Sequence, residues 1–309
     1  MPGQDNKLTY EKHLLQVNDR DTLAIHRFHT SSGGTPVMMI HGAIEDGKIF
    51  YSKNKRGIGP YLARHGYDVF IVDMRGKGES FPKIDKHLNQ TQKDAITIDI
   101  PSCISFIKNK TGHNKLHAVA HSWGGVWLYS LVGRLGHSND FKSFVMFGSK
   151  RRVSVFSPKR LIHLDLVWNI GGKLLNTAYG YTKFKKGVVG SEYEPKHVFL
   201  GMNQWVYTKK WISREDQFDY HEAFKHTEMP PTLHLTGIKD KILGNPVDVE
   251  KLIAEVGKHK DIEFSIVGKN YGNLHDYNHI NILTHKLAEE DVYPIALDWL
   301  NKFDEDENN

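Results

Sequence analysis

Short apolar runs that alternate with helical stretches restrict the fold of this 309-residue chain more than any other feature. The runs that suit buried strands cover residues 36–40, 68–72, 115–120, 143–147, 232–236 and 263–267. The stretches with helical spacing cover residues 58–64, 94–108 and 126–135. Because short buried strands that alternate with helices form βαβ units, the pattern predicts an α/β fold. Its sheet should be mostly parallel and covered by helices on both faces.

The two ends of the chain and its middle depart from this alternation. Two strands are expected at residues 13–17 and 22–28, and an amphipathic helix at 292–303. Between about residues 150 and 228 the alternation lapses, and this segment holds 13 of the 34 Phe, Trp and Tyr residues. An aromatic segment that is poor in Gly, Ser and Pro predicts a helical insertion and not a linker. We therefore expect a core of residues 1–149 and 229–309, with residues 150–228 as an inserted helical cap.

Composition excludes several classes of protein. Hydrophobic residues make up 39% of the chain and charged residues 25%, as in ordinary globular proteins. The net charge of +5, from 41 basic and 36 acidic residues, is mild and predicts no nucleic-acid partner. A single cysteine, Cys103, excludes an intrachain disulfide and a cysteine-based zinc site. Its helical, apolar surroundings favour a packed thiol over a nucleophile.

The chain shows no sign of a membrane span. Its first twelve residues are polar and lack the apolar stretch of a signal peptide. No run approaches the roughly 18 consecutive apolar residues of a transmembrane helix. We therefore expect a cytoplasmic protein; the sequence indicates no particular oligomeric state.

The segment Ala120-His121-Ser122-Trp123-Gly124-Gly125 carries the sharpest chemical signal. It joins a predicted strand to a predicted helix, where a nucleophilic serine needs a tight turn flanked by small residues. The usual spelling is G-x-S-x-G, and Ala120 replaces its first glycine. The turn would also bring the Trp123 N–H to a helix start, where it could stabilise an oxyanion. The alternative is a glycine-rich helix start that Ser122 merely caps.

Two further loops follow predicted strands. Gly42-Ala43, after His41, could present a second backbone donor for an oxyanion. The loop at residues 73–80 contains two glycines, but it lacks the G-x-G-x-x-G spelling and the P-loop Lys-Ser/Thr pair. It therefore favours a structural turn, with Arg75 paired to a carboxylate, over a phosphate-binding loop.

Together these residues resemble the α/β-hydrolase superfamily over residues 23–147 and 231–303, but not over the insertion. In family order, the matching positions are His41-Gly42, the loop 73–80, Ser122, Asp240 and His279. The resemblance implies an α/β-hydrolase fold in which Ser122 is the nucleophile, His279 the general base and Asp240 the acid. The other acid position in the family would fall near Ser149-Lys150, where no acid occurs, and Asp248 is a possible substitute for Asp240.

The segment around His279 allows a second interpretation. His275 and His279 would be four residues apart on a helix, as two zinc ligands are, but Asp276 replaces the glutamate of a zincin and no third ligand is evident. The register of the C-terminal segment, which resembles acid-lipase-like and bacterial esterase-like members, favours His279 as the base. The family often has Asp two residues further on, where this chain has Asn281.

The resemblance thus implies a serine hydrolase that cleaves a carboxylic ester or related acyl bond through an acyl-enzyme. The N–H groups of Ala43 and Trp123 would form the oxyanion hole, and no metal or organic cofactor is implied. Within the superfamily, a lactonase, thioesterase, C–C hydrolase, acyltransferase, haloperoxidase or non-catalytic ligand-binding protein remains an alternative. Aromatic residues of the insertion suggest an apolar pocket for a small acyl substrate; the alternative is that most of them pack the cap onto the core. The pocket candidates are Trp168, Trp205 and Trp211.

Overall fold

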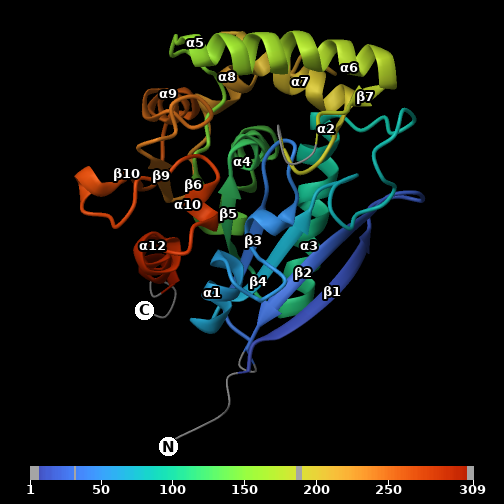
Figure 1. The fold of residues 1–309 in the computed structure, drawn as a ribbon. Coiled ribbons are helices and arrows are strands. Elements are labelled where there is room, and N and C mark those ends of the chain that lie inside the picture. Colours follow the sequence, from blue (N-terminus) through green and yellow to red (C-terminus); the bar gives the residue numbers. More distant parts are fainter. Residues whose placement is uncertain (1–6, 31–32, 186–189, 305–309) are drawn as a thin grey trace, which may run out of the picture.

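An eight-stranded sheet forms the centre of the computed structural model, which describes residues 7–30, 33–185 and 190–304 (Figure 1). The strands are β1 (Thr9–Gln16), β2 (Thr22–His29), β3 (Pro36–Ile40), β4 (Asp68–Asp73), β5 (Leu116–His121), β6 (Phe141–Phe147), β9 (Thr232–Gly237) and β10 (Ile262–Val267). Their order across the sheet is β1-β2-β4-β3-β5-β6-β9-β10. Strands β1 and β2 pair antiparallel, β2 pairs antiparallel with β4, and all other pairs are parallel. The predicted mostly parallel sheet is confirmed.

Helices cover both faces of the sheet and bury two separate apolar cores. They are α1 (Ile58–Arg64), α3 (Ile100–Thr111), α4 (Trp123–Leu135), α9 (Pro246–Val256) and α12 (Tyr293–Asp304). Successive strand side chains point to opposite faces. Met38 accordingly packs in the core under α3, α4 and α9, whereas Met39 packs in the core under α1 and α12. This alternation explains why the central strands are apolar throughout.

The untidy helical pattern before residue 111 has a structural cause. Helix α2 (Gln92–Asp94), the π-helical turn η2 (Ala95–Asp99) and α3 follow one another directly, with Pro101 in the first turn of α3. Proline has no N–H to donate to the preceding turn, and the π-helical turn η2, in which Ile100 N–H donates to the carbonyl of Ala95, lies directly before it. Cys103 is buried in the core, as predicted, and burial raises the pKa of its thiol well above the usual value.

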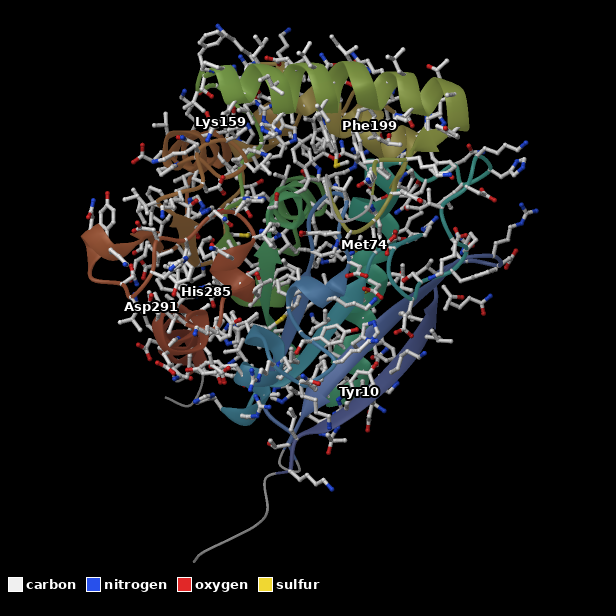
Figure 2. The ribbon with its side chains drawn as sticks, viewed as in Figure 1. Tyr10, Met74, Lys159, Phe199, His285 and Asp291 are labelled. Atoms are coloured by element: carbon white, nitrogen blue, oxygen red, sulfur yellow. The ribbon has the colours of Figure 1, made fainter. Side chains whose placement is uncertain are left out.

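Residues 150–228 lie over the carboxyl ends of the parallel strands (Figure 1). They contain α5 (Pro158–Arg160), the π-helical η4 (Leu161–Gly171), α6 (Gly172–Tyr179), β7 (Tyr181–Thr182), β8 (Glu194–Pro195), α7 (Lys196–Tyr207) and α8 (Tyr220–Phe224). The first three form one long helical run, and Figure 2 shows Lys159 near its start and Phe199 of α7 beneath it. Whether this segment acts as a cap stays a prediction.

Short helical turns complete the described elements. They are η1 (Gly47–Ile49), η3 (His137–Asp140), η5 (Lys269–Tyr271), α10 (Asn281–Thr284) and α11 (Ala288–Asp291). Across residues 7–30, 33–185 and 190–304, no helix combines the length and the apolar character needed to cross a membrane. Residues 1–6, on which part of the signal-peptide expectation rests, lie outside the described ranges.

Candidate active site

Ser122 occupies a strained turn between β5 and α4. Its backbone has φ 52° and ψ −116°, a conformation that residues other than glycine rarely adopt. The chain packs so closely here that a Cβ on Gly124 would lie 2.4 Å from the carbonyl oxygen of Ile40. The Ser122 side chain makes no capping hydrogen bond to α4, so the alternative of a simple helix cap is wrong. The turn instead leaves the hydroxyl free to meet residues from other loops.

The structure brings Ser122, His279 and Asp240 together in one hydrogen-bonded chain. The distance from Ser122 Oγ to His279 Nε2 is 2.9 Å, and that from His279 Nδ1 to Asp240 Oδ2 is 2.5 Å. Asp240 lies three residues after Gly237, the last residue of β9, and His279 lies in the long loop beyond β10. With Nδ1–H donating to the carboxylate, Nε2 is left to accept the Ser122 proton.

Burial and neighbouring charges set the protonation states of this pair. Burial lowers the pKa of His279, and the nearby His121 and Lys150 lower it further; the opposing effect of Asp240 is outweighed. Burial raises the pKa of Asp240, but the charge and hydrogen bond of His279 bring it below its ordinary value. At neutral pH the geometry therefore holds a neutral imidazole against an ionised carboxylate, the state that a general base requires.

Ala43 and Trp123, the two residues expected to supply the oxyanion hole, line the same cavity as Ser122. In the loop after β3, Gly42 N–H donates to Glu45 and Ile44 N–H donates to Glu194 Oε2 at 2.8 Å. The Ala43 N–H between them has no acceptor in the described part of the chain. Trp123 is the first residue of α4, where an N–H has no partner within the helix. Ala43 and Trp123 both line the cavity, so their N–H groups are available to a developing oxyanion.

Asp248, the alternative acid, and His275, the alternative base or zinc ligand, interact with other residues. Asp248, in α9, accepts hydrogen bonds from the backbone N–H (2.9 Å) and the hydroxyl of Ser154. His275 stacks on His285, with 4.0 Å between the ring centroids. The segment from His275 to His279 is not helical, so the two histidines do not share a helix face. In the ranges that the structure describes, no three His, Cys, Asp or Glu side chains are grouped to hold a metal ion.

Arg75 forms the predicted carboxylate pairs, with Asp21 and Asp99.

Sequence reasoning missed a second buried acid–histidine pair beside the first. Glu45 Oε1 lies 2.6 Å from His121 Nδ1, and His121 Nε2 lies 2.9 Å from the carbonyl oxygen of His279. Burial alone would lower the pKa of His121, but the Glu45 carboxylate raises it, so the imidazole can donate from both nitrogens. Since Glu45 also accepts from Gly42 N–H, this pair ties the oxyanion loop to the elbow and the histidine loop. Its only signal in the sequence is the adjacency of His121 to Ser122.

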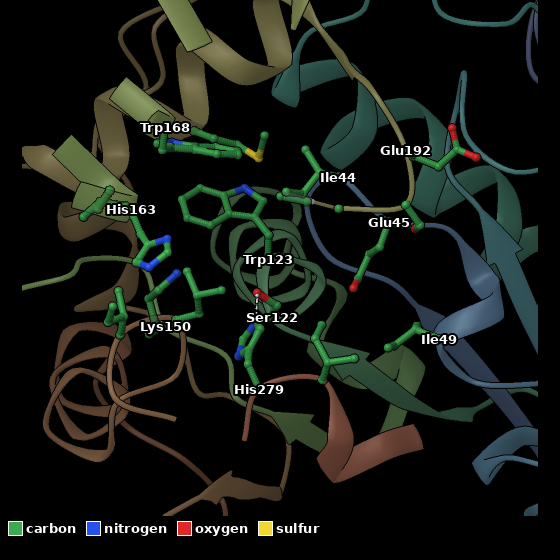
Figure 3. A pocket seen from close by; sticks show the side chains of 18 of the residues that line it. Ile44, Glu45, Ile49, Ser122, Trp123, Lys150, His163, Trp168, Glu192 and His279 are labelled. Carbon is green, nitrogen blue, oxygen red and sulfur yellow. Dashed lines mark hydrogen bonds between the residues drawn. The ribbon is translucent and has the colours of Figure 1, made fainter. Parts of the chain in front are cut away.

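A cavity of about 910 Å³ opens above Ser122 and His279 (Figure 3). The residues from the 150–228 segment that line it are Lys150, His163, Leu164, Val167, Trp168, Gly190, Ser191, Glu192, Met202 and Val206. Trp168 lines the cavity as expected and stacks on Phe184. The expectation for Trp205 and Trp211 needs correction, because neither is among the described lining residues. They are buried, at 1% and 2% exposed, and pack edge to face against each other behind Trp123.

Sequence comparisons show similarity to known proteins over part of this chain. A family model described as alpha/beta hydrolase fold matches residues 35–158. Lipase member N of Homo sapiens is 30% identical over 135 residues, which cover 40% of this chain and 33% of that protein. Lysosomal acid lipase/cholesteryl ester hydrolase of Rattus norvegicus is 28% identical over 131 residues, covering 37% and 33%. The matched region thus spans about a third of the length of these curated relatives.

Solved structures resemble nearly the whole chain. The Pyrococcus furiosus esterase Pf2001 superposes with a TM-score of 0.60 at 13% identity, covering 98% of this chain and 96% of that one. The 2-hydroxy-6-oxo-6-phenylhexa-2,4-dienoate hydrolase of Rhodococcus sp. strain RHA1 also gives 0.60, at 14% identity, covering 96% and 100%. At these identities the likeness concerns the fold alone, which an esterase and a dienoate hydrolase share.

Proposed function

We propose that the chain is a serine hydrolase of the α/β-hydrolase superfamily and that it cleaves carboxylic esters or related acyl bonds. The observation that carries this proposal is the hydrogen-bonded chain Ser122–His279–Asp240 at the floor of a large cavity. The lipase names among the relatives support an ester as the substrate.

The proposed reaction proceeds through an acyl-enzyme. Ser122 Oγ attacks the carbonyl carbon while its proton moves to His279 Nε2, and the carbonyl oxygen becomes an oxyanion held by the N–H groups of Ala43 and Trp123. The intermediate collapses as His279 gives the proton to the leaving alcohol. Water then attacks the carbonyl carbon of the ester on Ser122 while one of its protons moves to His279. The bond from that carbon to Oγ breaks as His279 returns the proton to Ser122, and the acid is released. Asp240 keeps Nδ1 protonated and stabilises the imidazolium in both halves.

Fluorophosphonate labelling tests the proposal most directly. A fluorophosphonate probe should label wild-type protein at Ser122, and p-nitrophenyl esters should be hydrolysed. Acyl thioesters and lactones in the same panel separate ester hydrolysis from the other acyl chemistries. A protein that takes no label and turns over none of these substrates would contradict the proposal and favour a ligand-binding role.

Replacing Asp240 by asparagine is expected to lower kcat by roughly 10²–10⁴-fold. The amide can donate to Nδ1 and so hold the wrong imidazole tautomer toward Ser122. Steady-state hydrolysis of a p-nitrophenyl ester measures the effect. Asp248→Asn is the matched control, because Asp248 bonds to Ser154 and not to His279. If the Asp248 variant were the inactive one, Asp240 would not be the acid.

We also propose that residues 150–228 act as a cap that selects substrates by size, since this segment supplies much of the cavity wall. Trp168→Ala enlarges the cavity and should shift the preference toward longer or bulkier acyl chains by at least about threefold in relative kcat/KM. Trp211→Ala is the control, because its loss should lower Tm without changing the preference. An unchanged chain-length profile for Trp168→Ala would assign that side chain to packing alone.

A further inference from the structure

Lys150 is a buried cation in the wall of the cavity. It follows β6 by three residues and is only 5% exposed. Figure 3 shows its side chain reaching into the cavity between His163 and the Ser122–His279 pair. Its Nζ lies 5.7 Å from the centre of the Trp123 ring, whose π-face partly compensates the charge. Lys150 therefore lies beside the reacting groups Ser122 and His279 and is not a surface lysine.

No described residue pairs with this ammonium group. Within residues 7–30, 33–185 and 190–304, nothing accepts a hydrogen bond from Lys150 Nζ, and no carboxylate lies within 4 Å of it. Asp240 and Asp248 act on it at longer range, but they are engaged by His279 and Ser154. Lys77, which is 2% exposed, shows the contrast, since it forms an ion pair with Glu194 at 2.8 Å.

The carboxylates on the opposite wall of the cavity do not compensate Lys150 either. Glu45 is bonded to His121 and to Gly42 N–H, and Asp46 pairs with Lys48 at 3.2 Å. Glu192, the third carboxylate that lines the cavity, acts on Lys48, whereas the carboxylates that act on Lys150 are Asp240 and Asp248. A buried charge without a partner is costly, and burial accordingly lowers the pKa of Lys150. A ligand that brought a negative charge to Nζ would remove this cost, which an apolar acyl chain cannot do.

We propose that Lys150, with His163 as a second donor, binds an anionic group of the substrate. The substrate would then be an ester or related acyl compound that carries a carboxylate or phosphate several bonds from the scissile carbonyl. This inference rests on the serine-hydrolase function proposed above. It adds the charge of the substrate, which neither the triad nor the size of the cavity specifies.

A matched pair of esters tests the inference. The anionic ester is p-nitrophenyl hemiglutarate; its neutral counterpart is p-nitrophenyl 5-methylhexanoate, in which an isopropyl end replaces the carboxylate at similar size. Lys150→Met should lower the ratio of kcat/KM for the anionic over the neutral ester by about 10–100-fold, because a charged hydrogen bond is lost. Lys150→Arg should recover part of that ratio. Lys258→Met removes an equal charge from an exposed site and should change the ratio less than about twofold.

Inhibition of neutral-ester hydrolysis distinguishes the two anions. If the site binds carboxylates, glutarate should inhibit the wild type and should inhibit Lys150→Met more weakly. If the site binds phosphate, inorganic phosphate should show the same difference between the two proteins. Melting curves and the partial recovery by Lys150→Arg show that a lower ratio does not come from misfolding.

Two results would overturn the inference. One is an equal fall for both esters in Lys150→Met, which would assign Lys150 to the electrostatics of His279. The other is a ratio of kcat/KM for the two esters that is the same in the wild type and in every Lys150 variant, together with no inhibition of the wild type by either anion. In both cases Ser122 would still label and the neutral ester would still turn over, so the proposed function would stand. Absence of labelling and of all turnover in the wild type would instead refute both.

Discussion

Replacing Ser122 by alanine is expected to lower kcat/KM by at least about 10³-fold. The hydroxyl is the proposed nucleophile, and its only side-chain hydrogen bond among the described residues goes to His279. Alanine keeps a Cβ in the same strained backbone conformation, so Tm should change little. Rates with a p-nitrophenyl ester, fluorophosphonate labelling and a melting curve measure these effects together.

Ser130→Ala provides the matched control for Ser122→Ala. Ser130 lies in α4, the helix that begins directly after Ser122, and its hydroxyl donates to the Val126 carbonyl of the same helix. Its loss should change the rate less than about twofold. A Ser122→Ala protein that kept more than about a tenth of the wild-type rate would show that another group attacks the substrate.

The central strands could be predicted from the sequence because burial on both faces leaves an uninterrupted apolar run. Strand β3 begins and ends at the expected residues 36 and 40, and β9 and β10 extend the expected runs by one residue. The elbow at Ser122 was equally accessible, because its strand, turn and helix are contiguous in the chain. Features that depend on neighbours in sequence were thus within reach of sequence reasoning.

Contacts between distant segments could not be predicted from the residue pattern, and those among Ser122, His279 and Asp240 were expected only through the family resemblance. Glu45 and His121 are 76 residues apart, and nothing local marks them as partners. Trp205 and Trp211 satisfy the same apolar pattern whether they line a cavity or pack against each other, and only the orientation of α7 decides. Lys150 lies near the position where the family resemblance would put an alternative acid. The position does lie beside the site, but it contributes a positive charge to the cavity.

Replacing His279 by alanine should lower kcat by at least about 10³-fold, because a serine without its base is a poor nucleophile at neutral pH. His279 is the only described side chain that hydrogen-bonds to both Ser122 and Asp240. His275→Ala is the matched control and should cost less than about 10-fold, since His275 instead stacks on His285 and contacts Asn281. The two variants are compared with one ester at saturating concentration, and an inactive His275 variant beside an active His279 variant would reassign the base.

The pH dependence of the wild type tests His279 independently of any substitution. The base must be neutral to accept the Ser122 proton, so the rate falls as pH drops through the pKa of His279. Burial, His121 and Lys150 hold that pKa below its ordinary value of about 6.5, and so the acid limb should lie below about pH 6.5. Lys150→Met removes one of these cations and should move the limb toward higher pH. A wild-type limb above about pH 7 would mean that attraction to Asp240 outweighs burial in setting the pKa of His279.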